Sequence, residues 1–349
     1  MKRRAFLKVM GGVTGTVAMG VAPVLLPDAH AAEPTGEMPL RTLGRTGFKV
    51  SVVGFSGFAL MHYDQERCNK DVRLAFERGL NYFDVAPAYD NGKCEDKLGV
   101  ALQALDRKQY FLACKTKKRD KAGVNEELER SLRKLKTDYF DVYQMHHLVR
   151  PEEVKTALGP GGALEAMLEA KKQGKIRAIG FSAHTTKAAV AALRGFDFDT
   201  VMFPVNYVEY YTRQYGQEVL AVAKEKGAAV LSIKTINSGS WPQGTQRTRQ
   251  WWYRPLEAQE DINLAYRWTL SLPGVVMGFP PAWLDLQEKA VLAGLAYRPA
   301  TESDGAKLES MARGCGSIMK REEDLVAGAA PARMPYPYHP TECCPGEWA

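Results

Sequence analysis

Short apolar runs alternate with longer amphipathic segments along most of this chain. The apolar runs have the length and composition of buried strands, and they lie at residues 50–55, 81–85, 110–114, 140–145, 176–181, 200–203, 229–233 and 274–277. Segments in which apolar residues recur every three or four positions predict helices at 71–78, 95–105, 125–135, 164–173, 186–193, 214–226, 259–270 and 282–293. Within 125–135, for example, Leu128, Leu132 and Leu135 share one face.

Strands that alternate with helices indicate a parallel sheet with right-handed crossovers. Eight such units over about 250 residues predict an α/β protein of the (β/α)8 TIM-barrel type. The alternative is an open, doubly wound sheet, but no GxGxxG motif follows the first predicted strand.

Two further segments flank the predicted barrel, which spans residues 39–295. At its start, residues 39–53 form two apolar runs around Arg45-Thr46-Gly47, which predicts a β-hairpin. After it, residues 296–349 form a C-terminal extension. Residues 303–326 have polar helical character, whereas 329–349 are rich in proline and aromatic residues and predict an irregular tail.

The first 31 residues have the pattern of a twin-arginine signal peptide. Arg3 and Arg4 precede Phe-Leu-Lys, a small-residue and apolar stretch follows, and Ala29-His30-Ala31 fits a cleavage site. Such a signal implies the twin-arginine export machinery as a partner and a periplasmic location. That pathway exports proteins that are already folded. An uncleaved signal would instead leave a membrane anchor, although its glycines and prolines make a poor span. No other run approaches the length of a membrane span, which predicts a mature chain without a stable one.

Export is therefore expected to depend on Arg3 and Arg4. Replacing both with lysine should leave folded precursor in the cytoplasm, as measured by cell fractionation. Continued export of the double variant would instead indicate the general secretory route.

The net charge argues against nucleic-acid binding, and the cysteine content leaves the disulfide pattern open. The net charge of +7 includes a contribution from the signal segment, and the remaining charge is too weak and scattered to predict nucleic-acid binding. In an exported protein, disulfides are permitted, but the sequence leaves their pairing open among Cys68, Cys94, Cys114, Cys315, Cys343 and Cys344.

Three successive predicted strands end in residues that can carry chemistry. The second ends in Asp84, with Tyr89 on the loop beyond, the third in Lys115 and the fourth in His146. Adjacent parallel strands bring their carboxyl ends to one mouth, so these side chains are expected to meet there. Strand alternation predicts that His147 faces away.

These segments resemble the aldo-keto reductase superfamily. Residues 83–95 follow its pattern FDTAxxYGxGxSE, Gln144-Met145-His146 its Q-x-H signature, and residues 43–51 its LGxTGxxVS hairpin, which plugs the bottom of the barrel. The resemblance implies reduction of an aldehyde or ketone, or oxidation of the alcohol, by hydride transfer from NADP(H) or NAD(H). Tyr89 is then the proton donor, and a nearby ammonium lowers the pKa of a phenol. Asp84 would hold Lys115, and His146 would orient the carbonyl.

The resemblance also implies a cofactor site, with departures. Its expected residues are Ser182, Asn206, Lys234, Gly278 and Lys289. However, Ala183 and Met202 stand where the family has two amide side chains, and Pro280 lies in the phosphate segment. The alternative is a barrel that has lost nicotinamide turnover and acts as an exported binding or redox-partner protein.

The C-terminal cysteines are reminiscent of a branch of the family with an iron–sulfur tail. That tail needs C-x2-C-x2-C-x3-C-P spacing, whereas this chain has Cys315 alone and then Cys343-Cys344-Pro345. No cluster and no metal site are therefore expected.

A long loop over residues 238–255 interleaves aromatic and basic side chains, including Trp251, Trp252 and Arg254. It is expected to be either a lid that packs on the barrel or a substrate wall that favours an aromatic or anionic molecule.

Overall fold

The computed structural model describes residues 36–328. The predicted signal peptide, the tail after residue 328, and Cys343 and Cys344 lie outside the described residues.

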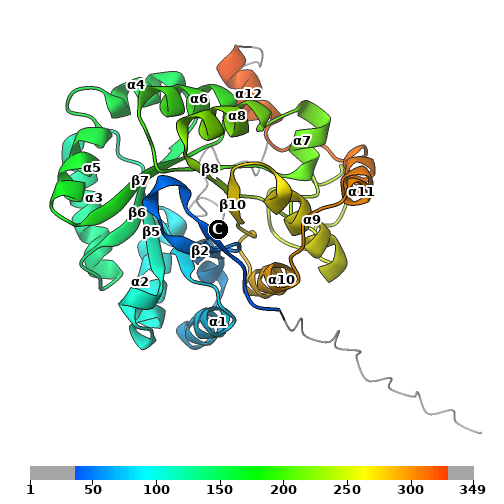
Figure 1. The fold of residues 1–349 in the computed structure, drawn as a ribbon, viewed down its shortest axis with the longest axis horizontal. Coiled ribbons are helices and arrows are strands. Elements are labelled where there is room, and N and C mark those ends of the chain that lie inside the picture. Colours follow the sequence, from blue (N-terminus) through cyan, green and yellow to red (C-terminus); the bar gives the residue numbers. More distant parts are fainter. Residues whose placement is uncertain (1–35, 329–349) are drawn as a thin grey trace, which may run out of the picture. The chain divides into compact units, whose positions relative to one another are not determined.

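Eight parallel strands form the central sheet, in chain order, each hydrogen-bonded to the next (Figure 1). They are β3 (Phe55–Ser56), β4 (Tyr82–Asp84), β5 (Phe111–Thr116), β6 (Phe140–Leu148), β7 (Ile176–Ala183), β8 (Thr200–Phe203), β9 (Ala229–Ser232) and β10 (Val275–Gly278). A parallel bridge between Val53 and Gly278 joins the two ends of this order. Gly54 N donates to Gly278 O at 3.1 Å, and Gly278 N donates to Val52 O at 3.0 Å. The sheet therefore closes on itself, as the alternation of strands and helices predicts.

Helices surround this sheet and cover its outer face (Figure 1). They are α1 (Gln65–Glu77), α2 (Lys93–Ala101), α3 (Lys121–Lys134), α4 (Pro151–Leu158), α5 (Ala163–Lys172), α6 (Thr186–Gly195), α7 (Tyr207–Arg213), α8 (Gln217–Lys226), α9 (Gln259–Ser271) and α10 (Leu284–Leu295). In α3 the side chain of Asp120 caps the first turn by accepting from Gly123 N. Leu128 and Leu132 are buried on its inner face, as their spacing predicts.

Several predicted elements differ from the structure. The segment predicted as one strand at 50–55 is divided, because Lys49–Ser51 pairs antiparallel in the hairpin, whereas Phe55–Ser56 and an isolated bridge at Val53 pair within the barrel. The helix predicted at 214–226 begins later, since Gln214 and Gly216 both have positive φ and separate α7 from α8. Helix α4 was not predicted at all.

The N-terminal hairpin covers the bottom of the barrel, as the resemblance implies. It consists of β1 (Leu40–Thr42) and β2 (Lys49–Ser51), joined by a short 3-10 turn. Leu43 and Val50 are fully buried and pack against side chains that point into the barrel: Tyr82, Ala113, Val142, Ala178, Met202, Ala229, Leu231 and Met277. Gly44 approaches Asp199 O and Ala229 N, which lie where β8 and β9 begin. The hairpin therefore closes the end of the barrel opposite the carboxyl ends of the strands.

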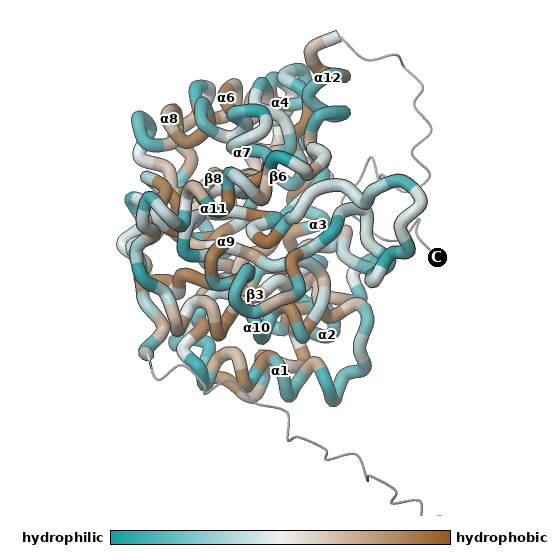
Figure 2. The backbone as a smooth tube through the Cα atoms, turned by 90° about the vertical axis from the view of Figure 1, so that its right-hand side faces the viewer, coloured by the Kyte–Doolittle hydropathy of each residue, from teal (hydrophilic) through white to brown (hydrophobic). Residues whose placement is uncertain are grey.

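The C-terminal extension contains two helices, α11 (Glu302–Ala312) and α12 (Lys320–Ala327), which confirms the polar helical character of residues 303–326. The segment between them is held by Glu209 of α7, whose carboxylate accepts from Ser317 Oγ and Ile318 N, both at 2.6 Å. Glu323 accepts from Thr186 N at 2.5 Å, which ties α12 to the start of α6. Figure 1 accordingly shows α12 near α6, and Figure 2 shows α12 at the same end of the molecule as α4, α6 and α8.

Within residues 36–328, no helix has the length and apolar character needed to cross a membrane.

Candidate active site

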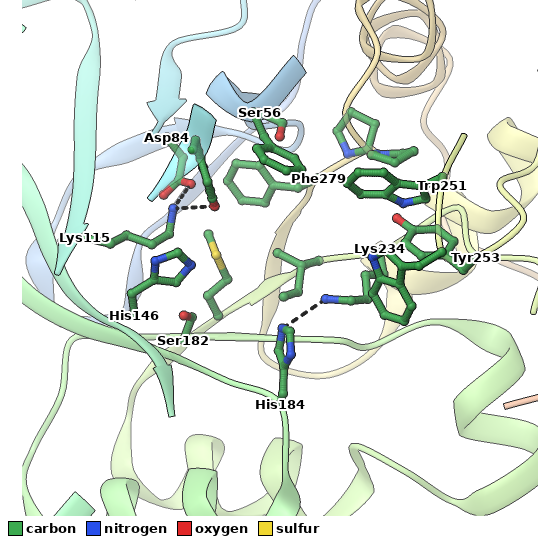
Figure 3. Close-up of a pocket in the computed structure, with 17 residues that line it drawn as sticks. Ser56, Asp84, Lys115, His146, Ser182, His184, Lys234, Trp251, Tyr253 and Phe279 are labelled. Atoms are coloured by element: carbon green, nitrogen blue, oxygen red, sulfur yellow. Dashed lines mark hydrogen bonds and ion pairs between the residues drawn. The ribbon is translucent and has the colours of Figure 1, made fainter. Parts of the chain in front are cut away.

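The four residues expected at the barrel mouth are brought together (Figure 3). Asp84 ends β4, Lys115 lies near the end of β5, and His146 lies near the end of β6. Tyr89 opens a short turn in which Asp90 and Asn91 both have left-handed backbones. These short polar residues tolerate that conformation, and the turn brings Tyr89 beside the ends of the strands.

A buried ion pair lies at the centre of this group. Lys115 Nζ contacts Asp84 Oδ2 directly, and it also donates to Val85 O at 3.3 Å and Tyr89 Oη at 3.2 Å. Asp84 Oδ1 accepts from Gln144 Nε2 at 3.0 Å. Burial raises the pKa of the Asp84 carboxyl, while the Lys115 ammonium and the Gln144 amide oppose that rise. The ammonium is therefore fixed beside the phenolic oxygen of Tyr89.

His146 completes the group with a neutral imidazole. Burial, together with the positive charge of Lys115, holds its pKa well below the ordinary value of 6.5. Its ring lies edge-on to that of Tyr89, with 5.6 Å between the centroids. A neutral ring has one N–H donor, so His146 can donate a hydrogen bond to an oxygen bound beside Tyr89.

All four side chains line one cavity, with an empty volume of about 750 Å³ that includes its opening to solvent. The other lining residues come mainly from the ends of the remaining strands and from the long loop after β9: Ser56, Phe58, Ser182, His184, Met202, Ile233, Lys234, Trp251, Trp252, Tyr253, Phe279, Pro280 and Pro281. Trp251 packs against Phe58 and Trp283, at centroid distances of 5.4 and 5.2 Å. The aromatic loop therefore forms one wall of the cavity (Figure 3).

Two of the five residues expected to hold a cofactor lie at this cavity. Ser182 Oγ accepts from His147 N at 2.7 Å, and Lys234 Nζ lies 3.1 Å from His184 Nε2. Lys234 has a left-handed backbone, with φ of 59°. Both side chains therefore remain candidates for binding a ligand in the cavity.

The other three are not among the lining residues. Asn206 caps α7, because its Oδ1 accepts from Glu209 N at 3.1 Å. Gly278 packs closely, and a Cβ there would lie 2.8 Å from the Tyr266 ring. Lys289 lies on α10 and donates to Glu257 O at 2.6 Å. Each of the three has a structural partner that accounts for its position.

As strand alternation predicts, His147 does not line the Tyr89 cavity, but the backbone around it is irregular. Its φ is +60°, and the pairing of β6 with β7 shifts register between Met145 and Leu148. The imidazole consequently lies against that of His184, with 4.3 Å between the ring centroids. A pattern of alternating residues could not reveal this contact, because it depends on where the irregular end of β6 places the ring.

The described cysteines are all free thiols. Cys68, Cys94 and Cys114 are buried, and Cys315 is partly exposed. Cys114 lies in the core beside Glu95, as expected for a residue that faces the helix layer. The part of the chain from residue 36 to 328 therefore has no disulfide.

Comparison with known proteins agrees with this geometry. Residues 52–272 match the model of the Aldo/keto reductase family. The chain is 31% identical over 226 residues to aldo-keto reductase YhdN of Bacillus subtilis, a match covering 58% of this chain and 63% of that protein. It is 30% identical over 217 residues to L-galactose dehydrogenase of Arabidopsis thaliana, covering 58% and 67%.

Solved structures show the same fold. The aldo-keto reductase AKR11C1 from Bacillus halodurans superposes with a TM-score of 0.65 at 23% identity, covering 82% of this chain and all of that one. The iron–sulfur branch is not indicated by any of these matches. Because the family model covers more than half of its length, the chain belongs to the aldo/keto reductase family.

Proposed function

We propose that this protein reduces an aldehyde or ketone, or oxidises the corresponding alcohol, with a nicotinamide cofactor and with Tyr89 as proton donor. The observation that supports this most is the contact between Tyr89 Oη and Lys115 Nζ, 3.2 Å apart, at the cavity that His146 also lines. Membership of the aldo/keto reductase family supports the same reaction type.

The residues of the site suit the proton transfer. Addition of hydride turns a carbonyl oxygen into an alkoxide, which needs a proton donor close by. Tyr89 can give that proton, and the adjacent Lys115 ammonium stabilises the phenolate that remains. Asp84 keeps Lys115 in place through the buried ion pair. The N–H of neutral His146 can stabilise the developing charge on the oxygen.

The cavity has the chemical character needed for the nicotinamide end of the cofactor, which when bound supplies or accepts the hydride. The Ser182 hydroxyl accepts from His147 N and still has its own proton to donate to an amide. Met202 and Phe279 offer apolar surface for a ring. Lys234 lies across the cavity from Asp84 and Lys115, and its ammonium can bind a phosphate (Figure 3).

Two departures from the family pattern weaken this site. Ala183 and Met202 lack the expected amide groups, each worth roughly 0.5–1.5 kcal/mol as a neutral hydrogen bond. Pro280 and Pro281 also have no backbone N–H to donate. We therefore propose that Lys234 replaces part of the lost binding energy, and that NADH and NADPH bind with similar affinity.

Titration of the full-length protein with NADPH and NADH tests this. We expect dissociation constants of micromolar or tighter, with NADH disfavoured little. Lys234→Met should weaken both by about tenfold, the scale of a charge-assisted hydrogen bond. Lys289→Met is the matched control. Lys289 lies on α10 and donates to Glu257 O, so this substitution should leave nucleotide affinity unchanged. If neither nucleotide binds at millimolar concentration, the alternative of an exported binding or redox-partner protein is supported instead.

We also propose that the protein acts in the periplasm. The support is the twin-arginine pattern of residues 1–31, and the exchange of Arg3 and Arg4 described above tests it. Free nicotinamide nucleotide is expected to be scarce there, so a folded protein that carries its nucleotide outward would regenerate it by oxidising one substrate and reducing another.

A further inference from the structure

Three side chains from distant parts of the chain converge beside the cavity. His147 comes from β6, His184 follows β7, and Glu322 comes from α12. Glu322 Oε2 lies 3.2 Å from His184 Nδ1, and Glu322 Oε1 lies 3.9 Å from His147 Nε2. One atom from each of the three lies within 4.8 Å of the others. We refer to these residues as the His147–His184–Glu322 cluster.

The cluster is buried, and it is incompletely hydrogen-bonded. His147 is 8% exposed, His184 3% and Glu322 7%. Within residues 36–328, neither His147 Nε2 nor Glu322 Oε2 has a hydrogen bond of good geometry, although Glu322 Oε2 lies at ion-pair distance from His184 Nδ1. Buried polar atoms normally have partners, since leaving one without any costs about 1–3 kcal/mol. His147 Nε2 and Glu322 Oε2 both belong to groups that ligate metals.

The backbone of His147 also bears a cost. Its left-handed conformation is uncommon for residues other than glycine, and such strain concentrates at functional sites. In this conformation the ring of His147 lies 4.3 Å, centroid to centroid, from that of His184. The conformation therefore brings a second imidazole to Glu322.

We propose that the His147–His184–Glu322 cluster binds a divalent transition metal of the zinc class. Two imidazoles and one carboxylate are a known ligand set for catalytic zinc, which keeps a further position open, whereas magnesium and calcium prefer oxygen ligands. In a tetrahedral site with bonds of about 2.0–2.1 Å, ligand atoms lie about 3.3 Å apart. The carboxylate of Glu322 lies 3.2 and 3.9 Å from the two imidazoles, and the three ligand atoms lie within 4.8 Å of one another, so metal binding would draw the three side chains closer together.

The open coordination position has access to solvent. His147 and Glu322 line a second groove together with Arg119, Val149 and His146, and His146 also lines the cavity of Tyr89. Its empty volume is about 1000 Å³, including open solvent. A water molecule or an anionic ligand can therefore reach the metal from the groove.

Lys234 opposes metal binding, so replacing it should change the metal affinity in a predictable direction. A metal on His184 Nδ1 places the ring proton on Nε2, yet Lys234 Nζ lies 3.1 Å from Nε2. An ammonium cannot accept a hydrogen bond, so Lys234 must move away when the metal binds. Removing its charge, as in Lys234→Met, should therefore tighten metal binding while it weakens nucleotide binding.

Titration of chelator-treated, full-length protein with Zn²⁺ tests the proposal. We expect one ion per chain. Glu322→Gln should weaken binding by about tenfold or more, because even the loss of a residue that only hydrogen-bonds to a metal ligand lowers metal affinity by that factor. Glu323→Gln is the matched control, because the neighbouring carboxylate accepts from Thr186 N at the start of α6 and not from the cluster. Lys234→Met should bind Zn²⁺ more tightly than the unmodified chain.

Co²⁺ provides an independent readout that does not depend on activity. Bound at the cluster, it should give the visible absorption of a four- or five-coordinate site, which at the same Co²⁺ concentration is strongly diminished in Glu322→Gln and retained in Glu323→Gln. Urea unfolding of both variants checks that they are folded. The proposal is overturned if no Zn²⁺ binds at millimolar concentration, or if Zn²⁺ binds the folded Glu322→Gln variant as tightly as the unmodified chain.

Discussion

Tyr89→Phe is expected to lower the rate of carbonyl reduction by about 10²-fold or more, the usual scale for an acid–base group. The substitution removes only the hydroxyl, which lies 3.2 Å from Lys115 Nζ, and leaves a ring that can still pack on Phe58 and His146. The turnover number should therefore fall while nucleotide affinity is retained. Steady-state rates with a panel of small aldehydes measure the change.

Tyr82→Phe is a matched control for that measurement. Tyr82 lies two residues before Asp84 on the same strand, and its hydroxyl is buried with no hydrogen-bond partner in the described residues. Removing it should leave the rate unchanged. Equal rates for Tyr89→Phe and the unmodified protein would exclude Tyr89 as proton donor.

Lys115→Met is expected to destabilise the fold as well as abolish turnover. It leaves the Asp84 carboxylate buried without its counter-charge, since Lys115 and Asp84 side chains are 0% and 5% exposed. Breaking a buried pair from one side costs about 3–5 kcal/mol. The free energy of unfolding in urea measures this cost.

The double variant Asp84→Asn/Lys115→Met separates the charge effect from the loss of packing. Because the asparagine oxygen can still accept from Gln144 Nε2, which lies 3.0 Å from Asp84 Oδ1, most of the lost stability should return. Turnover should not return, since no ammonium remains beside Tyr89. A double variant as unstable as Lys115→Met would show that packing, and not the unpaired charge, sets the cost.

The fold and the positions of the central site residues could be predicted from the sequence, because both follow from the regular geometry of parallel strands. Parallel strands that follow one another in a closed sheet bring their carboxyl ends together. Asp84, Lys115 and His146 stand at three successive strand ends, so their meeting follows from topology alone. The buried pair of Asp84 and Lys115 could likewise be expected from charge.

Irregular geometry was not predictable in the same way. The orientation of His147 depends on a left-handed residue and a register shift, which no period of two can show. The contact of Glu322 with two histidines requires the docking of α12, far along the chain. The contact of Lys289 with Glu257 O likewise depends on how α10 packs, which the sequence does not show.

The departures at Ala183 and Met202 concern the cofactor more than the chemistry. Both residues are buried at the ends of β7 and β8, near Ser182. They reduce the hydrogen bonds available to a nicotinamide amide but leave the contact between Tyr89 and Lys115 intact. Weak nucleotide binding with normal proton transfer would therefore be consistent with these changes.

Transfer of deuterium tests the central claim most directly. Full-length protein is incubated with NADPH or NADH deuterated at C4 of the nicotinamide and with an aldehyde, and the alcohol product is analysed by mass spectrometry. We predict one deuterium on the former carbonyl carbon, formed by the unmodified protein and by Tyr82→Phe and strongly diminished with Tyr89→Phe. Nucleotide that binds while no deuterium reaches any aldehyde or ketone of a broad panel would contradict the assignment of this site as a carbonyl reductase.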